Sequence, residues 1–268
     1  MPEDDRMMLR TMRRVFRRMS TSINLDETLS IAIEQHIPWY SYGHVGAIVW
    51  PSSKLLLRHL KQQPCLPPDI VELGSGTGIL GIGTGALSRG NVVLTDRPPS
   101  SRESGERNIL DLIETNVQLN PHLEGTFSIL PLTWGDDELI NRCIEQSRGG
   151  QGFGLVVGSD VSYHLPALGR LFYTARRLLR KEAATDEELR GFLISHQMRG
   201  QHSYETMLRA AADAGFAEPA CVLKADGAEN EQIKLVLHFQ LHDGDRDLEL
   251  ERANLPPTPA PPTSERRP

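Results

Sequence analysis

The sequence has no run of apolar residues long enough to cross a membrane. A membrane-spanning helix needs about 20 predominantly apolar residues in succession, and no segment of this 268-residue chain approaches that length. No apolar signal-peptide core follows the basic residues near the start. We therefore expect a soluble protein that is not secreted, does not bind membranes and resides in the cytoplasm, with the nucleus as a second location.

Cysteine is scarce, and its spacing argues against two kinds of site. The three cysteines, Cys65, Cys143 and Cys221, lie far apart and form no C-x-x-C pair, so neither a zinc site nor a disulfide framework is indicated. We predict no metal and a reducing compartment. The formal net charge of −6 at pH 7 disfavours nonspecific nucleic-acid binding and weakly favours a basic substrate.

The two ends of the chain differ in composition from its middle. The first twenty residues follow Glu3, Asp4 and Asp5 with six arginines among apolar residues; because transit peptides avoid acidic residues, we expect a leading helix rather than a targeting signal. The final "PPTPAPPTSERRP" predicts a disordered or polyproline-like tail. We predict a leader over 1–22, one monomeric domain over 23–242, and a tail over 243–268.

Strand-like and helix-like segments alternate through the middle of the chain. Strands are predicted at 29–35, 69–73, 91–95, 127–133, 154–159 and 191–195, and helices from about Ser52, from Thr77, at 106–120, after Asp136, at 165–181 and at 203–215. This alternation predicts an α/β fold with a mostly parallel sheet covered on both faces. The last part, 219–242, reads as two strands around a polar loop, which predicts a C-terminal antiparallel hairpin.

A glycine-rich turn, "VELGSGTGILG", follows the strand at 69–73 and fits two spacings. Gly76, Gly78 and Gly81 fit the G-x-G-x-x-G of dinucleotide binding, whereas Glu72, Gly74, Gly76 and Gly78 fit the E-x-G-x-G-x-G typical of S-adenosylmethionine (SAM) binding. Glycines let the backbone turn tightly and approach a ligand, and the start of the next helix offers unpaired N–H groups. The turn predicts a nucleotide-like ligand in either spacing.

Polar residues end four of the predicted strands, where ligands bind in open α/β sheets. These residues are Glu72, Asp96, Trp134, and Ser159 with Asp160, and Tyr163 follows one turn later. A carboxylate at Asp96 can accept both ribose hydroxyls of an adenosine, so it fits either cofactor. An anion at Glu72 would repel a pyrophosphate but stabilise the ammonium and sulfonium of SAM, which favours SAM. A purely structural role for Glu72, as a helix cap or backbone partner, stays open.

With these residues the chain resembles the eukaryotic seven-strand protein-lysine methyltransferases, the methyltransferase-like family 21 group. The matching stretches are "GAIVWPSS", "VELGSGTGILG", "VVLTD", "LIETNVQLN", "LTWG" and "LVVGSDVSYH". The last contains the D/E-x-x-Y signature of the family through Asp160 and Tyr163. The resemblance extends from about Leu25 to His242. The segment "RPPSSRESGE" at 97–106 looks like an insertion relative to the family.

The resemblance implies a Rossmann-like, seven-stranded class I methyltransferase fold and methyl transfer from SAM to a lysine side chain of a protein. Carried over by position, it implies a cofactor site formed by Trp50, Glu72, Gly74, Ser75, Gly76, Thr77, Gly78, Asp96, Trp134 and Ser159. It places Asp160 and Tyr163 against the substrate amine as the catalytic residues.

Three alternatives to a lysine methyltransferase stay open from the sequence. The first is an NAD-dependent oxidoreductase using the G-x-G-x-x-G spacing, although the chain lacks an evident hydride-transfer constellation such as a Tyr-x-x-x-Lys pair. The second is a catalytically silent methyltransferase fold that acts as a binding protein. The third is a methyltransferase whose acceptor is arginine or the nitrogen of a small molecule.

Overall fold

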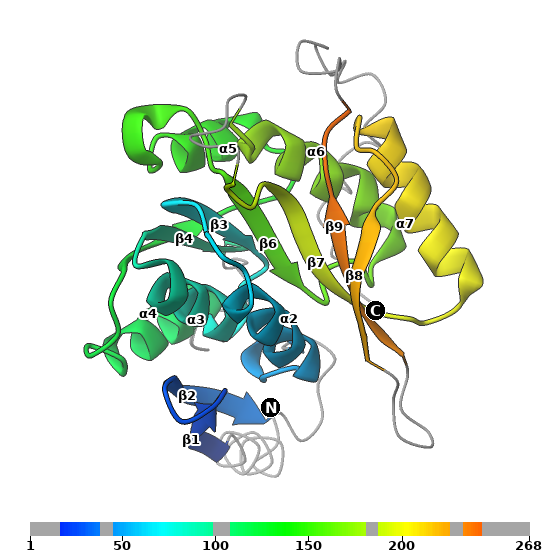
Figure 1. Cartoon of the computed structure of the whole chain (residues 1–268). Helices are drawn as coiled ribbons and strands as arrows, with labels where there is room; N and C mark the ends of the chain where they lie inside the picture. Colours follow the sequence, from blue (N-terminus) through cyan, green and yellow to red (C-terminus); the bar gives the residue numbers. More distant parts are fainter. Residues whose placement is uncertain (1–16, 38–44, 99–107, 181–186, 226–232, 243–268) are drawn as a thin grey trace, which may run out of the picture.

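A seven-stranded sheet forms the centre of the protein (Figure 1). The computed structural model describes residues 17–37, 45–98, 108–180, 187–225 and 233–242. The strands of the sheet are β3 (Asp69–Leu73), β4 (Asn91–Asp96), β5 (Thr126–Pro131), β6 (Leu155–Ser159), β7 (Gly191–Gln197), β8 (Ala220–Ala225) and β9 (Lys234–Phe239). Their order is β5-β4-β3-β6-β7-β9-β8. The first five strands in this order are parallel, and β9 pairs antiparallel with both β7 and β8, which confirms the mostly parallel sheet and its C-terminal antiparallel hairpin.

Helices cover both faces of the sheet, as the alternation predicted (Figure 1). One face is covered by α2 (Pro51–Lys61), α3 (Ile79–Ser88) and α4 (Ile109–Gln118), and the other by α5 (Asp137–Ile144), α6 (Leu168–Leu178) and α7 (Gln201–Asp213). Short 3-10 turns, η1 (Val45–Ala47), η2 (Arg148–Gly150) and η3 (Leu165–Ala167), precede or follow these elements. Within the described residues, no helix is long and apolar enough to cross a membrane.

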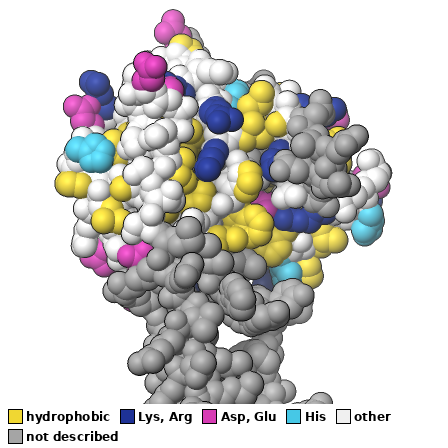
Figure 2. Space-filling model, turned by 90° about the horizontal axis from the view of Figure 1, so that it is seen from below, with side chains coloured by type: hydrophobic (Ala, Val, Ile, Leu, Met, Phe, Trp, Pro, Cys, Tyr) yellow, Lys and Arg dark blue, Asp and Glu magenta, His cyan; other side chains and the backbone are white. Residues whose placement is uncertain are grey.

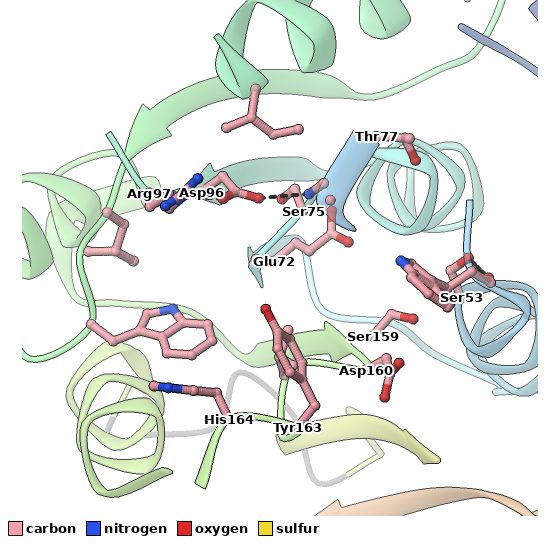
Figure 3. Close-up of a pocket in the computed structure, with 18 of the residues that line it drawn as sticks. Ser53, Glu72, Ser75, Thr77, Asp96, Arg97, Ser159, Asp160, Tyr163 and His164 are labelled. Atoms are coloured by element: carbon pink, nitrogen blue, oxygen red, sulfur yellow. Dashed lines mark hydrogen bonds between the residues drawn. The ribbon is translucent and has the colours of Figure 1, made fainter. Parts of the chain in front are cut away.

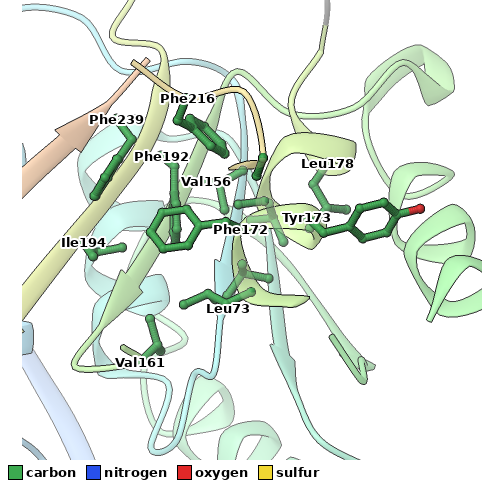
Figure 4. Packing of buried hydrophobic residues seen from close by; sticks show 14 of the residues in the cluster. Leu73, Val156, Val161, Phe172, Tyr173, Leu178, Phe192, Ile194, Phe216 and Phe239 are labelled. Carbon is green, nitrogen blue, oxygen red and sulfur yellow. The ribbon is translucent and has the colours of Figure 1, made fainter. Parts of the chain in front are cut away.

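A cluster of phenylalanines fixes the half of the sheet that carries β6 and β7 (Figure 4). The ring of Phe172 on α6 makes edge contacts with Phe192 on β7, with Phe216, and with Phe239 on β9, at centroid distances of 5.6, 5.8 and 5.0 Å. All four side chains are buried, and each such burial contributes about 2–3 kcal/mol. The strand ends that lead into the functional site therefore start from a closely packed core.

Three glycines let α3 lie unusually close to its neighbours on the other face. A Cβ at Gly81 would lie 2.6 Å from the Glu72 carboxylate, and one at Gly83 would lie 2.7 Å from Leu57 on α2. Gly85 is packed in the same way against the ring of Phe127. Glycine inside a helix costs about 1 kcal/mol relative to alanine, and these close contacts explain why glycine stands at the three positions despite that cost.

A separate two-stranded sheet lies at the start of the described residues and corrects one prediction. β1 (Arg17–Asn24) pairs antiparallel with β2 (Ser30–Ile37) along its whole length. The expected leading helix is therefore wrong for residues 17–20, and the boundary placed between 22 and 23 falls inside β1. The physical reason is an alternation of period two at the end of the leader, where Ile23 is buried while Ser20, Ser22 and Asn24 are exposed. Residues 1–16 and the predicted tail at 243–268 lie outside the described residues.

Asn116 on α4 and Asn120, two residues after the end of this helix, hold the small sheet, and Asn116 also holds the glycine turn. The Asn116 side chain accepts a hydrogen bond from the Glu34 N–H at 2.7 Å and donates to the Glu34 carbonyl and to the Thr77 carbonyl. Asn120, four residues later, bonds the Ala32 N–H and carbonyl in the same way. Buried backbone groups of β2 thus have side-chain partners in place of a third strand, and the turn at Thr77 is held from behind.

Candidate functional site

One cavity of about 690 Å³ opens at the carboxyl ends of the parallel strands (Figure 3). It lies where the strand order reverses between β3 and β6, the expected ligand position in an open α/β sheet. The predicted residues that line it are Trp50, Glu72, Gly74, Ser75, Gly76, Thr77, Asp96, Trp134, Ser159, Asp160 and Tyr163. The face toward which β6 and β7 point carries Lys and Arg side chains among hydrophobic ones (Figure 2).

The glycine turn forms one wall of the cavity and depends on residues without side chains. Gly74 and Gly76 have φ angles of 65° and 57°, a conformation that costs other L-residues about 1–2 kcal/mol. A Cβ at Gly76 would lie 2.6 Å from the Gly46 carbonyl oxygen, and one at Gly74 would lie 2.9 Å from Val161. The turn is therefore enclosed by η1 on one side and by the segment after β6 on the other.

Gly78 is the one predicted cofactor residue that does not line the cavity. It is the N-cap of α3 with a φ of 79°, and its Cα faces the side chains of Leu94 and Ile113. Its place in the motif reflects the left-handed start of the helix and its close packing against β4 and α4.

Asp96 ends β4 and presents its carboxylate to the cavity (Figure 3). Its Oδ2 accepts a hydrogen bond from the Gly76 N–H at 2.8 Å, and its Oδ1 accepts one from the Arg97 N–H at 2.8 Å. Burial raises the pKa of this carboxyl group, and the two N–H donors oppose that shift. Since each carboxylate oxygen can accept more than one hydrogen bond, the held side chain can also receive hydroxyl groups of a ligand.

Glu72 lines the cavity and also takes the structural role that the sequence left open. Its Oε2 accepts a hydrogen bond from the Gly81 N–H in the first turn of α3, at 2.9 Å. Burial raises the pKa of Glu72 to about 8, with a further contribution from the charge of Asp96, while bonds from Ser75 and Gly81 oppose the shift. The sequence predicts an anion here beside a cationic ligand, whereas in the protein alone burial favours the protonated form of this carboxyl group.

The same contact bears on the two spacings of the turn. In a dinucleotide site the N–H groups at the start of this helix receive the pyrophosphate. Here Gly81, the third glycine of that spacing, donates its N–H to Glu72 and does not line the cavity. In a dinucleotide site the third glycine serves close packing of the helix against the strand, so this contact is compatible with both spacings.

Asp160 stands on a strained turn directly after β6. Its φ of 53° is left-handed, which is uncommon for a residue with a side chain, and its N–H donates to the Ser195 carbonyl at 2.8 Å. The turn is compact because Val161 fits against Gly74 and Gly158. Strain of this kind concentrates at functional sites.

The two oxygens of the Asp160 carboxylate differ in their hydrogen bonding. Arg199 Nη2 donates to Oδ2 at 2.7 Å, whereas Oδ1 is buried and has no hydrogen-bond partner among the described residues. Burial raises the pKa of Asp160, and the hydrogen bond and charge of Arg199 oppose that shift. Asp160 lines the cavity, and its Oδ1 is a buried acceptor whose hydrogen-bonding capacity a donor group on a ligand would satisfy.

Tyr163 is the exposed member of the predicted pair. It is 52% exposed, lies at the cavity beside His164 (Figure 3), and has the Arg199 guanidinium 5.6 Å from its ring centroid. Arg199 thus contacts both predicted catalytic residues. Arg199 is not among the residues predicted from the sequence, although it comes two residues after the end of β7, where the strand-end rule that selected Asp96 and Asp160 also applies.

The two tryptophans both border the cavity. Trp134 is half-buried and packs against the core beside Gly74, so it has a packing role as well as lining the cavity. Trp50 is half-buried at the N-cap of α2, where its carbonyl accepts hydrogen bonds from the Ser53 N–H and hydroxyl. Further lining residues not predicted include Ile48, Ser53, Arg97, Ile109, Thr133, Val161, His164 and Arg170.

Comparison with solved structures identifies proteins with a similar fold. The fold is similar to that of SMU.776, described as a methyltransferase and complexed with S-adenosylhomocysteine (SAH), with a TM-score of 0.53 at 8% identity over 82% of this chain and 56% of that chain. At this identity the likeness concerns the fold alone, and it confirms the seven-stranded class I methyltransferase fold.

Comparison with sequences gives the family. A family model described as lysine methyltransferase matches residues 29–211, so the chain belongs to the lysine methyltransferase family. Mouse (Mus musculus) EEF1A lysine methyltransferase 3 is 29% identical over 167 residues, covering 62% of this chain and 61% of that protein. Mouse protein N-lysine methyltransferase METTL21A is 32% identical over 132 residues, covering 47% and 51%. The chain thus spans between half and two thirds of the length of these relatives.

Proposed function

We propose that this protein transfers a methyl group from SAM to a lysine side chain of a protein substrate. The observation that carries the proposal is the pairing of two walls around one cavity. The glycine turn and Asp96 form an adenosine-type wall, and Asp160 offers an open carboxylate oxygen on the other. Membership of the lysine methyltransferase family supports the same activity.

The residues present fit SAM. Gly74 and Gly76 form a cradle that a Cβ would fill, and this lets a ligand approach the backbone of the turn. Asp96 would hold the ribose hydroxyls, and Trp50 and Trp134 would border the adenine and the methionine portion. Glu72, buried behind the turn, would give up its proton more readily next to a cationic ligand, since a nearby opposite charge favours the carboxylate.

For methyl transfer the protein mainly has to place a neutral amine in line with the carbon–sulfur bond of SAM. When bound, SAM supplies a methyl group on a positively charged sulfur; the nitrogen lone pair forms the new bond and the carbon–sulfur electron pair leaves with SAH. Positioning supplies much of the acceleration in such a reaction. A lysine with a pKa of about 10.4 in solution must lose its proton to water first. Asp160 Oδ1 would accept an N–H of the amine, and Tyr163 would border its channel.

The choice of lysine and of a protein as substrate is supported by the relatives. Those cited above are named as lysine methyltransferases, and the D-x-x-Y signature lies at the cavity in this structure. The arginine and small-molecule alternatives remain outcomes of the test.

Two experiments test the proposal. Isothermal titration with SAM and with NAD should show binding of SAM alone. Incubation with radiolabelled SAM and a cell lysate, followed by mass spectrometry of the labelled band, should place the methyl group on a lysine. Asp160→Ala should bind SAM normally and lose label transfer, while Asp111→Ala, an exposed carboxylate on α4, should keep both. Binding of NAD would overturn the choice of SAM as the cofactor. Full transfer by Asp160→Ala would overturn the role given to Asp160.

A further inference from the structure

The Arg199 side chain connects the two residues that would face the substrate amine. Its Nη2 is 2.7 Å from Asp160 Oδ2, and its guanidinium carbon is 5.6 Å from the centre of the Tyr163 ring. The contact joins residues 39 positions apart in the chain. The Asp160 side chain is only 6% exposed, whereas that of Arg199 is 33% exposed, so the arginine reaches from the rim onto a buried carboxylate.

The contact divides the two oxygens of Asp160 between two tasks. Arg199 engages Oδ2 and fixes the plane of the carboxylate, and Oδ1 is left as a buried acceptor without a partner among the described residues, on a side chain that lines the cavity. A carboxylate that turned freely would present either oxygen to an incoming amine. Arg199 thereby sets the direction from which an N–H can be accepted, and direction matters for an in-line displacement.

The charge of Arg199 matters separately from its geometry. A lone buried carboxylate would stabilise the ammonium form of a lysine beside it, and that form has no lone pair to react. Paired with a guanidinium, Asp160 contributes almost no net charge, so an amine can be held by hydrogen bonding without a strong preference for its protonated form. Burial without Arg199 would also raise the pKa of Asp160 further.

Few other charged or titratable groups face Asp160 from the elements around it. On β7, the backbone N–H of Gln197 lowers the pKa of Asp160 by hydrogen bonding. His196 is on the same strand, and burial lowers its pKa to about 4, so this imidazole is neutral at neutral pH. Lys234 at the start of β9 adds a weaker favourable charge. The Tyr163 ring lies against the same guanidinium, with its centre 5.6 Å from the guanidinium carbon. Arg199 is therefore the main cationic influence on this carboxylate among the described residues.

We propose that Arg199 is a positioning residue for methyl transfer, which aims Asp160 Oδ1 at the substrate amine and neutralises the carboxylate so that the amine reacts uncharged. The proposal rests on the proposed function. Without the guanidinium, the pair formed by the amine and Asp160 would bind one more proton at neutral pH than it does in the wild type. That proton would sit either on the amine or on the carboxyl group, and it would have to leave before methyl transfer.

The test compares pH–rate profiles at saturating SAM, using the lysate fraction that contains the labelled acceptor. Arg199→Gln keeps a hydrogen-bond donor but removes the charge. It should move the midpoint of the profile upward by about one pH unit, so that the rate near pH 7 falls about tenfold and recovers at higher pH. Arg199→Lys keeps the charge, and its midpoint should stay within about half a unit of the wild type while its plateau rate falls, because a single ammonium fixes the carboxylate plane less well.

Two controls separate this role from a general effect on folding. Arg142→Gln removes an exposed arginine that pairs with Glu138 on α5 and should leave the profile unchanged. SAM affinity measured by titration should agree within about twofold for all variants, because Arg199 does not line the cofactor wall.

Each outcome has a distinct meaning. A profile of Arg199→Gln that superimposes on the wild type overturns the positioning role alone. If Arg199→Gln fails to fold, Arg199→Lys decides, and a shift of a full unit in that variant contradicts the role assigned to charge. Absence of transfer by the wild type with any lysate overturns the proposed function and this inference together. Normal SAM binding in the titration shows that such a result does not come from a damaged preparation.

Discussion

The two walls of the cavity are built by different means. The β3–β4 wall is made of backbone, with left-handed glycines and N–H groups directed at Asp96 and Glu72, all within about 25 residues of chain. The β6–β7 wall is made of side chains from distant segments, with Asp160 held by Arg199 and Tyr163 exposed. A wall fixed by backbone suits an invariant cofactor, whereas a wall set by side chains suits a particular substrate.

The largest expected effect is on the backbone-built wall. Gly76→Ala adds a Cβ that would lie 2.6 Å from the Gly46 carbonyl, at a φ of 57°. Strain and clash together should cost about 3 kcal/mol, which weakens SAM binding about a hundredfold. Gly149→Ala is the matched control, because Gly149 has a φ of 78° with open space around its Cα. It should lower stability slightly and leave SAM affinity, measured by titration, unchanged; equal affinities for both variants would contradict the enclosed turn.

The buried carboxyl group behind the same wall should make stability depend on pH. The folded-state pKa of Glu72, about 8, lies above its ordinary value of 4.5, so the folded chain binds a proton that the unfolded chain releases. This contribution is complete below about pH 4.5 and is lost as pH rises toward 8. Relative to Glu72→Gln, which cannot titrate, the wild type should lose about 3 kcal/mol of unfolding free energy between about pH 5 and pH 8.

Denaturant unfolding of both proteins at the two pH values measures this difference. The other titrating groups are common to both proteins, so they cancel in the comparison. Parallel pH dependences for wild type and Glu72→Gln would mean that this carboxyl group is ionised across the range and that its environment is more polar than the structure indicates.

Asp96→Asn tests the same wall, and its expected effect on SAM affinity is smaller than that of Gly76→Ala. The substitution removes the charge and turns one acceptor into a donor, which cannot accept the N–H of Gly76 and of Arg97 at once. A hydrogen bond to a charged group contributes about 1.5–3 kcal/mol, so SAM affinity should fall about thirtyfold. Asp136→Asn, at the N-cap of α5, changes the same charge away from the cavity and should have no effect on the titration.

The smallest expected effect belongs to the exposed residue of the side-chain wall. Tyr163→Phe keeps the ring under Arg199 and removes only the hydroxyl, so label transfer should slow by a few-fold at most while SAM affinity stays the same. Tyr163→Ala removes the ring as well and should slow transfer further. If both variants bound SAM poorly, Tyr163 would belong to the cofactor wall and the division between the two walls would be wrong.

The difference between the walls also explains what the sequence could predict. The glycine turn is a local pattern, so its spacing and the acid at the end of the next strand identify the cofactor wall, and the strand-end rule places Asp160. The strand-end rule also reaches Arg199, but the contact of Arg199 with Asp160 could not be predicted, because it depends on how β6 and β7 pair. The protonation of Glu72 depends on burial by α3, and β1 depends on its partner β2. Cellular location and oligomeric state stay predictions.

A crystal structure of the protein with SAH tests the central claim most directly. The account predicts the ribose hydroxyls within hydrogen-bond distance of Asp96, the amino-acid end against the Gly74–Gly76 turn, and the sulfur facing the open Oδ1 of Asp160. SAH bound elsewhere, or bound in this cavity with Asp96 turned away into solvent, would contradict it.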